Sequence, residues 1–596
     1  MPSSASPPEA ASSRSNPVTL TPQPPSQPES TTVQEASPQD FLATHRAGQT
    51  FLSWKESGST PFWALYRQPP GDAPDTAQPP LAVLERDACA APRQASLPQS
   101  PQKRWILTPL GPELAPGWSC YVHTPHLSEE ARAVYWLLPL THATATPALA
   151  QALRVEIIER PGTPEPLLIQ DAPGGRRKLF TQWLDDRLPR ASADGPAFNF
   201  WVGLPPGKAP TTGWPLTIHL HAWGESWQRF YQSSSPASPG TPYDLPMAWL
   251  ELDDPSNTWW TGAVARPLYQ PQAAAQAMLH TEARVLAVIE WLLSPASGMP
   301  IDPERVTLYG GSMGGTGALA LSLHHPSRFA AVYAQLPLIR PASSTWGRPG
   351  FQALFGNPLD PPRLANGKTL YEYLDLIQTL AEQQGGSGPF TVTLHGRTDQ
   401  IIEWSTQGLP WLQAVTHHGA PGPALFAEGD HSSVFDSFTA KLIPNFRPSE
   451  GHFRRHEPYP VFSNFSGDDD PAAPLPACRH PDRLYRYGFV GGGIRWSGQG
   501  VSLLGLDQPE ESPTTLRLGL QIRSDLCNLP QEGTTDITLH RLRQLQVGPE
   551  KRIGWETFDA RGQRRSTGVG RLVQGRIRLD KVPVTQEGIL LSVWSR

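Results

Sequence analysis

The chain has little of what marks metal-binding, membrane-spanning or nucleic-acid-binding proteins. Its 596 residues include only four cysteines, with no Cys-x-x-Cys pair and no cysteine at metal-ligand spacing from a histidine. A zinc site is therefore not expected. No window approaches 18 uncharged apolar residues, so we expect no transmembrane helix. A net charge of −5 provides no general basic surface for nucleic acid.

The four cysteines leave the redox compartment open. Cys89 and Cys120 precede the middle of the chain, and Cys478 and Cys527 follow it. The pairs Cys89–Cys120 and Cys478–Cys527 would suit an oxidising compartment, and four buried thiols fit the sequence equally well. The first residues show neither a basic region nor an apolar core of a signal peptide. Either the chain is intracellular, or a leader lies upstream, or export uses another route.

Proline, glycine and tryptophan are abundant, with 68, 51 and 20 residues, which indicates many loops and much β-structure. The length requires several domains. Residues 1–40 are rich in proline and serine and predict a disordered tail. Residues 41–160 and 451–596 contain short alternating runs between turn signals, and each predicts a β-sandwich. Residues 161–199 read as a linker.

Residues 200–450 alternate between strand and helix patterns, which predicts an α/β domain with a mostly parallel sheet covered on both faces. The functional site of such a sheet lies at the carboxyl ends of its strands. We expect strands at 216–221, 306–309, 330–334, 391–394 and 424–427, and helices at 273–293, 315–325 and 405–417.

One turn in this segment predicts a reaction. A β-branched and aromatic run ends in Gly310-x-Ser312-x-Gly314, and a helix-forming run follows. This is the pattern of a nucleophile elbow, a strand-to-helix turn so sharp that it presents the serine hydroxyl above the sheet. The alternative is a tight turn with a buried serine. The flanking strand and helix favour Ser312 as a nucleophile for acyl transfer.

A serine nucleophile needs a histidine base and a carboxylate that orients it, in the chain order Ser, Asp, His for this type of sheet. Asp399 follows a late strand, and His431 follows the last short strand and a glycine turn. Asp430 is a rival acid, but a sequence neighbour usually points away from the imidazole. The rival bases do not follow a strand: His417, His418, His452 and His456.

An oxyanion hole completes the expected site. One donor should be the backbone N–H of Met313, which follows the nucleophile. The second should come from the loop after an early strand, where we predict the Trp223 N–H, with its indole lining the acyl pocket. Trp404 follows the acid loop and is a second candidate for substrate binding. Trp259 and Trp260 could line the cleft or belong to the core, and we expect structural roles for the nearby His219 and His221.

Residues 200–440 resemble the α/β-hydrolase superfamily, and most closely its bacterial esterase, depolymerase and prolyl-oligopeptidase-like branches. The resemblance rests on His221-Ala-Trp-Gly224, Gly310-x-Ser312-x-Gly314, His395-Gly-x-x-Asp399 and Gly429-x-His431. Ala222 departs from the usual glycine, which affects the geometry of the oxyanion loop. More weakly, residues 44–143 resemble a fibronectin type III module through the strand-like runs 46–54 and 63–67. Such modules accompany catalytic domains of secreted bacterial hydrolases, so we expect an extracellular or periplasmic location.

These patterns predict a serine hydrolase that cleaves carboxylic esters through an acyl-enzyme, without metal or organic cofactor. Its substrate would be a small ester or one linked to a polymer or carbohydrate. Neither nucleic acid nor a membrane span is expected, and the oligomeric state is not indicated. A serine peptidase of the prolyl-oligopeptidase-like branch shares the motifs, but no propeller repeats precede the catalytic segment. A non-catalytic binding protein is the third reading, and the intact Ser, Asp and His argue against it.

Overall fold

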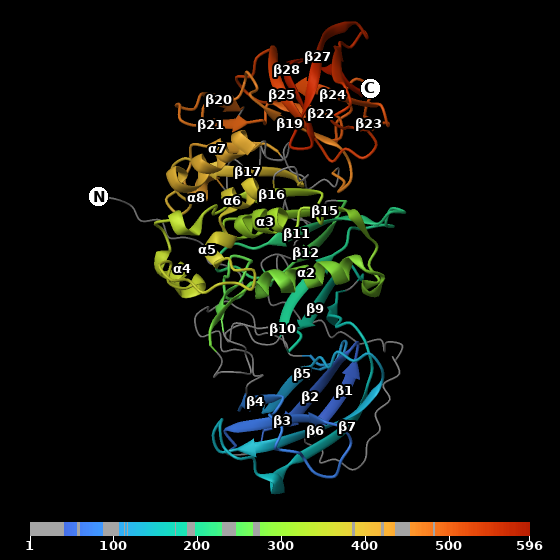
Figure 1. Ribbon diagram of the computed structural model, residues 1–596, viewed down its shortest axis with the longest axis vertical. Helices are drawn as coiled ribbons and strands as arrows, with labels where there is room; N and C mark the ends of the chain where they lie inside the picture. The colour runs from blue at the N-terminus through green and yellow to red at the C-terminus, as the bar shows by residue number, and fades with distance from the viewer. Residues whose placement is uncertain are drawn as a thin grey trace, which may run out of the picture.

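A computed structural model describes residues 41–56, 60–86, 106–112, 114–115, 117–172, 174–186, 197–228, 246–265, 274–383, 388–418, 422–434, 453–480 and 483–596. Three regions follow one another along its long axis (Figure 1). Strands β1 to β7 form one end, a mixed sheet with helices forms the middle, and a C-terminal sheet forms the other end. The predicted tail, residues 1–40, lies outside the described residues. Within them, no helix has the length and apolarity that crossing a membrane requires.

The middle region is built on one sheet of eleven strands, in the order β20-β21-β18-β17-β16-β15-β11-β12-β10-β9-β8. Neighbours from β18 to β12 are parallel, and the strands outside them are antiparallel. The bounds are β8 (Leu167–Asp171), β9 (Arg177–Trp183), β10 (Ala197–Gly203), β11 (Trp214–Leu220), β12 (Ala248–Glu251), β15 (Ile301–Gly311), β16 (Ala331–Gln335), β17 (Phe390–Gly396), β18 (Ala424–Ala427), β20 (Ala477–His480) and β21 (Arg483–Val490).

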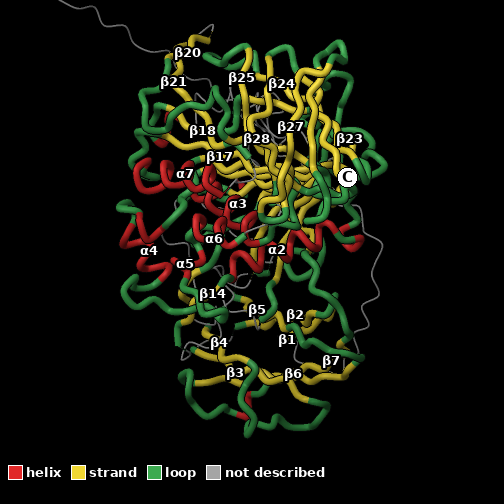
Figure 2. The backbone as a smooth tube through the Cα atoms, turned by 45° about the horizontal axis from the view of Figure 1, so that its top comes forward, coloured by secondary structure: helices red, strands yellow, loops and turns green. Residues whose placement is uncertain are grey.

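All but the shortest of the described α-helices pack on one face of this sheet. Their apolar side chains share a core with alternate strand residues such as Ile218, Leu308 and Val332. Figure 2 shows these helices as a band between two strand-rich regions. The helices are α2 (His280–Leu293), α3 (Met313–His324), α4 (Arg348–Phe355), α5 (Leu370–Tyr373), α6 (Leu376–Glu382), α7 (Leu409–His418) and α8 (His431–Ser433). Short turns are η1 (Leu149–Gln151), η3 (Pro295–Ser297), η4 (Pro341–Ser343) and η5 (Trp404–Gly408), and a small hairpin joins β13 (Ala263–Ala265) to β14 (Gln276–Met278).

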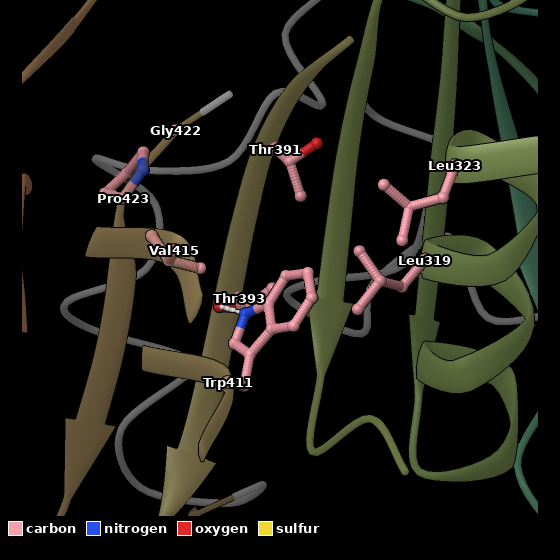
Figure 3. Close-up of a pocket in the computed structure, with 8 residues that line it drawn as sticks. All are labelled: Leu319, Leu323, Thr391, Thr393, Trp411, Val415, Gly422 and Pro423. Carbon is pink, nitrogen blue, oxygen red and sulfur yellow. Dashed lines mark hydrogen bonds between the residues drawn. The ribbon is translucent and has the colours of Figure 1, made fainter. Parts of the chain in front are cut away.

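Helix α7 is anchored to the sheet through Trp411. Trp411 is buried and donates its indole N–H to Thr393 Oγ1 at 3.0 Å. Figure 3 shows this bond in a small pocket lined by α3, α7, the first half of β17 and the two residues that precede β18. Because Thr391 lies at the amino end of β17 and Pro423 directly precedes β18, this pocket lies away from the carboxyl edge where the sequence predicts the site.

The opposite face of the sheet is covered by β-structure. Tyr333, Val392 and Leu425 share a core with the C-terminal strands. Phe390 stacks on Phe453 with ring centroids 4.6 Å apart, and Tyr459 donates its hydroxyl to the carbonyl of Gly388 at 2.6 Å. The expectation that both faces are covered therefore holds, but in the described residues a second sheet replaces one of the helix layers.

The C-terminal region forms one antiparallel sheet in the order β19-β25-β28-β27-β26-β29-β24-β22, with β23 beside β24. The bounds are β19 (Tyr459–Ser463), β22 (Ile494–Trp496), β23 (Glu510–Glu511), β24 (Thr515–Ile522), β25 (Glu532–His540), β26 (Ile553–Phe558), β27 (Arg564–Val573), β28 (Arg576–Thr585) and β29 (Ile589–Ser595). Alternating burial along β29 shows that one side faces the shared core.

The N-terminal region contains two antiparallel sheets, β1-β2-β5 and β4-β3-β6-β7. They share one core, to which Trp54 contributes from the first sheet and Tyr135 from the second. Buried Glu159 joins them, because it accepts from Thr50 at 2.7 Å and from Tyr135 at 2.6 Å. The bounds are β1 (Phe41–Arg46), β2 (Gln49–Lys55), β3 (Phe62–Gln68), β4 (Ala82–Glu85), β5 (Trp118–His123), β6 (Ala131–Leu140) and β7 (Leu153–Glu159).

The structure differs from the expected domain limits in two places. The segment read as a linker, 161–199, holds β8 and β9, which form one edge of the central sheet. Strands β20 and β21 of the expected C-terminal domain, 451–596, form the opposite edge of the central sheet. Antiparallel edge strands lack the strand–helix alternation that marked the sheet in the sequence, so the pattern could not assign them.

Two helices begin at other positions than expected. The helix expected at 273–293 begins at His280, because β14 occupies part of its first half. The helix expected at 405–417 begins with the turn η5.

The structure decides part of the cysteine question. Cys527 is disulfide-bonded, which excludes four free thiols. Cys120 is buried. Cys89 and the side chain of Cys478 lie outside the described residues.

Candidate active site

The turn between β15 and α3 holds Ser312 in a strained conformation. Its φ of 54° and ψ of −119° are ones that side-chain-bearing residues rarely adopt. The turn is tied to the next strand, since the Ser312 N–H donates to the carbonyl of Gln335 at 2.8 Å. A Cβ at Gly314 would lie 1.8 Å from the carbonyl oxygen of Leu220, and one at Gly310 would lie 2.3 Å from that of Gly314. Only glycines permit this turn.

A chain of hydrogen bonds runs from this serine to a carboxylate. His431 Nε2 lies 3.0 Å from Ser312 Oγ, and His431 Nδ1 lies 2.7 Å from Asp399 Oδ2. Asp399 extends from the loop after β17, and His431 begins α8 just beyond β18. The carboxyl ends of three parallel strands thus bring together three residues separated by up to 119 positions. This arrangement allows His431 to remove the serine proton.

The two neighbouring carboxylates have different partners. Asp399 uses Oδ1 to accept the N–H groups of Ile401 and Ile402 at 2.8 and 2.9 Å, which leaves Oδ2 for the histidine. Asp430 accepts the N–H groups of Ser432 and Ser433 as the N-cap of α8. These hydrogen bonds, Ser433 first, lower the pKa of the Asp430 carboxyl. Asp430 therefore caps the helix that carries His431.

The rival histidines lie elsewhere. His417 and His418 end α7, with their rings 4.7 Å apart. His456 Nδ1 lies 2.6 Å from Glu304 Oε2 at the start of the C-terminal region. His452 lies outside the described residues. None of the three described rivals is hydrogen-bonded to Ser312 or Asp399.

The expected oxyanion donors stand on two sides of Ser312. Met313 is the first residue of α3, so its N–H belongs to the unpaired, partly positive start of a helix. Trp223 lies in the loop after β11. The N–H groups of Ala222, Gly224 and Glu225 in that loop donate to Glu225 Oε2, Asn257 Oδ1 and the carbonyl of Ala222. The Trp223 N–H has no such acceptor among the described residues.

Buried His221 fixes the start of the loop that carries Trp223, which we call the oxyanion loop. Its Nε2 accepts the N–H of Asp254 at 3.0 Å, and its Nδ1 donates to the carbonyl of Ala222 at 2.9 Å. Burial alone would lower its pKa, but the negative charge of nearby Asp253 raises the pKa above the usual value. Gly224 has a φ of +75°, whereas Ala222 is not in the left-handed region. The usual glycine is thus dispensable at 222 and required at 224.

The other motif histidines have structural surroundings. His219 Nδ1 lies 2.7 Å from Glu251 Oε1, and its ring contacts the rings of Trp249 and Tyr309. His395 is fully buried in β17, and burial lowers its pKa to about 3. His395 is therefore neutral at the pH values at which the chain would act.

The candidate tryptophans divide into two groups. Trp260 is buried against His221, and Trp404 packs on Phe426, with ring centroids 5.5 Å apart, beneath the guanidinium of Arg397. Packing accounts for both, and nothing in these contacts points Trp404 toward Ser312. Trp223 is 47% exposed and lies beside buried Trp259. The predicted substrate contact of Trp223 is compatible with this exposure.

Sequence reasoning missed two residues next to this group. Trp346 lies edge-to-face against Trp223, with ring centroids 6.4 Å apart. Glu403, four positions after Asp399, accepts the N–H of Trp346 at 3.1 Å. Neither lies in a recognisable motif, because their proximity arises only when the segment after β16 folds against the loop after β17.

Part of this region is similar in sequence to known esterases. The Esterase family model matches residues 290–384. The S-formylglutathione hydrolase of Rattus norvegicus is 37% identical over 168 residues, which is 27% of this chain and 52% of that protein. That of Paracoccus denitrificans (strain Pd 1222) is 39% identical over 150 residues, 25% and 49% of the two chains. The chain spans about half the length of the curated relatives it matches.

The same likeness appears among solved structures. An S-formylglutathione hydrolase from Agrobacterium tumefaciens aligns with a TM-score of 0.35 and 17% identity, covering 48% of this chain and 98% of that one. The α/β-hydrolase fold of the middle region rests on its own sheet topology and on the similarity to the Esterase family.

Proposed function

We propose that the chain is a serine hydrolase that cleaves carboxylic esters. The observation that carries this proposal is the continuous Ser312–His431–Asp399 hydrogen-bond chain at the carboxyl edge of the sheet. Sequence similarity to esterases and S-formylglutathione hydrolases supports the same class of reaction.

The proposed mechanism uses only groups of this chain. His431 Nε2 accepts the Ser312 proton while Oγ attacks the ester carbonyl carbon, and the N–H groups of Met313 and Trp223 stabilise the oxyanion. The protonated imidazole then donates its proton to the leaving alkoxide, and an acyl-serine remains. A water that gives its proton to His431 hydrolyses this intermediate. Asp399 keeps the Nδ1 proton in place and stabilises the imidazolium.

The finer parts of the proposal concern substrate and setting. An extracellular or periplasmic location, a polymer- or carbohydrate-linked ester and a fibronectin type III-like role for residues 41–160 remain expectations. The disulfide at Cys527 is consistent with an oxidising compartment. The two-sheet N-terminal region could bind a polymer or only brace the catalytic region, and we favour bracing because both flanking regions share cores with the middle sheet.

The test is hydrolysis of p-nitrophenyl acetate, butyrate and octanoate by the wild type and by Ser312→Ala. We expect wild-type turnover, a loss of at least about 10³-fold in the variant, and a chain-length preference that reports the depth of the acyl pocket. Labelling of Ser312 by a fluorophosphonate confirms the nucleophile independently. A folded wild type that cleaves peptide anilides but no esters would favour the peptidase reading. One that neither turns over nor is labelled would favour a binding protein.

A further inference from the structure

The oxyanion loop carries an aromatic surface that the reaction itself does not require. Trp223 is 47% exposed and Trp346 is 36% exposed. Beneath Trp223 lies Trp259, 1% exposed, with ring centroids 6.2 Å apart, and Phe351 of α4 packs on Trp259 at 5.3 Å. Two indoles therefore share one accessible apolar surface, supported by a buried aromatic layer. We call Trp223 and Trp346 the aromatic platform.

Trp223 stands in a loop whose first residues pack against the nucleophile elbow. Leu220 and Gly310 are paired in the parallel strands β11 and β15, and the Leu220 and His221 carbonyls touch the elbow at Gly314. Trp223 follows two residues later, so its indole extends from the loop that offers the oxyanion N–H.

A carboxylate holds the main chain of the segment that carries the second indole. Glu403 Oε1 accepts the main-chain N–H groups of Thr345 and Trp346 at 2.9 and 3.1 Å and the hydroxyl of Thr345. Its Oε2 accepts the hydroxyl of Thr406 at 2.9 Å. Burial alone would raise the pKa of this carboxyl, but the hydrogen bonds lower it, so Glu403 is ionised at neutral pH. The Trp346 segment is therefore fixed to the acid loop that carries Asp399.

These contacts connect the loop after β11 with the loop after β17. Trp223 belongs to the loop after β11, and Trp346 is bound to the loop after β17. Exposed indoles in such a position present flat apolar faces, which favour rings over flexible chains because a ring loses little conformational entropy on stacking. The rigid support beneath Trp223 adds pre-organisation.

Accordingly, we propose that Trp223 and Trp346 select esters that carry a flat or sugar-like ring close to the carbonyl, and that Glu403 is the positioning residue that holds Trp346 in place. This inference rests on the proposed ester hydrolase function and names its substrate class. The ring could be aromatic or a saturated sugar ring, since both stack on indole.

The first experiment measures ring selectivity, defined as kcat/KM for benzyl acetate divided by that for hexyl acetate, in a pH-stat. We expect the wild type to prefer benzyl acetate and Trp346→Ala to lose about ten-fold in this ratio, mainly through KM. Trp346→Phe should retain part of it. Val569→Ala, which removes another exposed apolar side chain on β27, serves as the control. An unchanged ratio in Trp346→Ala would overturn the platform.

The second experiment concerns Glu403. Glu403→Ala should lower ring selectivity as much as Trp346→Ala does, and the double variant should lose no more than either single variant. Glu403→Gln should recover part of it, because its amide oxygen can still accept a main-chain N–H. Full selectivity in Glu403→Ala, or additive losses in the double variant, would show that Glu403 does not act through Trp346.

A binding measurement separates the platform from the reaction. Ligand-observed saturation-transfer NMR on Ser312→Ala tests benzyl acetate, cyclohexylmethyl acetate and a methyl 6-O-acetylglucoside without turnover. Saturation of ring protons that disappears in Ser312→Ala/Trp346→Ala supports the platform, and the strongest ligand identifies the ring type. Such binding in a chain with no esterase activity would refute the function and keep the platform. Ester turnover by the wild type without saturation of ring protons would support the hydrolase function and refute the platform.

Discussion

At the scale of single residues, the site distinguishes two carboxylates that the sequence could only rank. Asp430 precedes His431 in the sequence, and Asp399 lies beside His431 in the folded chain. Asp399 reaches Nδ1 because Ile401 and Ile402 fix its other oxygen, whereas Asp430 turns back to cap α8. A residue that starts a helix directs its side chain at that helix's own N–H groups, so it cannot also orient the next side chain.

This difference predicts unequal effects of the same chemical change. Asp399→Asn should lower kcat on p-nitrophenyl butyrate by roughly 10³- to 10⁴-fold, because an amide no longer holds the Nδ1 proton or stabilises imidazolium. Asp430→Asn should change kcat by less than about three-fold, since asparagine caps a helix nearly as well as aspartate. Steady-state kinetics of the two variants decides the matter, and a larger loss in Asp430→Asn would reverse the assignment.

At the scale of elements, the elbow depends on how closely β11, β15 and α3 approach one another. Gly314 begins the first turn of α3 directly against the last residues of β11, and Gly315 faces Gln335 at the end of β16. Gly317, one turn on, faces Trp260. The helix can start above Ser312 only because these positions lack side chains. The repeated glycines thus serve packing as well as the turn itself.

Two glycine-to-alanine changes separate these effects. Gly314→Ala should destabilise the chain by about 3 kcal/mol, because its Cβ would lie 1.8 Å from the Leu220 carbonyl oxygen. Gly350→Ala, in α4, meets no atom within 4 Å and should stabilise by up to about 1 kcal/mol. Urea denaturation followed by circular dichroism measures both. Equal stability of the two variants would mean that the elbow relaxes to accept a side chain.

At the scale of the whole molecule, the central sheet has helices on one face and the C-terminal sheet on the other. Strand β21 continues the central sheet beyond β18, and Arg541 donates to the carbonyls of Phe329 and Ala330. The strand β17 is therefore enclosed between layers, and its His395 has no hydrogen-bond partner for either ring nitrogen in the described residues. We expect these layers to unfold together.

The burial of His395 makes stability depend on pH. Its folded-state pKa of about 3 lies below the ordinary 6.5, so below pH 6.5 the unfolded chain binds a proton that the folded chain refuses. Stability from this group is complete above pH 6.5 and falls by ~3 kcal/mol by pH 4. Between pH 7 and pH 4, the midpoint temperature of unfolding should fall less in His395→Leu than in the wild type. The surface variant His142→Leu should show the same fall as the wild type. Parallel wild-type and His395→Leu curves would contradict this account.

The candidate site could be predicted largely from the sequence because its parts are local patterns. Gly310-x-Ser312-x-Gly314 requires a particular turn, and Asp399 and His431 each follow a strand whose composition is recognisable. Five of the six parallel strands were also detectable, since their buried runs alternate with helices; β18 has the bounds expected, 424–427, whereas β12 was missed. Sequence order then placed all three residues at one edge of the sheet.

Only the tertiary structure decided which loops meet. The edge strands β8, β9, β20 and β21 have patterns typical of any antiparallel pair, so their membership of the central sheet depends on partners far away in the chain. Trp346 and Glu403 carry no motif and become neighbours through folding, and Trp404 proved to be packed on Phe426 for the same reason. A catalytic residue that sits in a local turn can be recognised from consecutive residues of the sequence. A surface that combines side chains from separate loops forms only when the chain has folded, so the sequence does not show it.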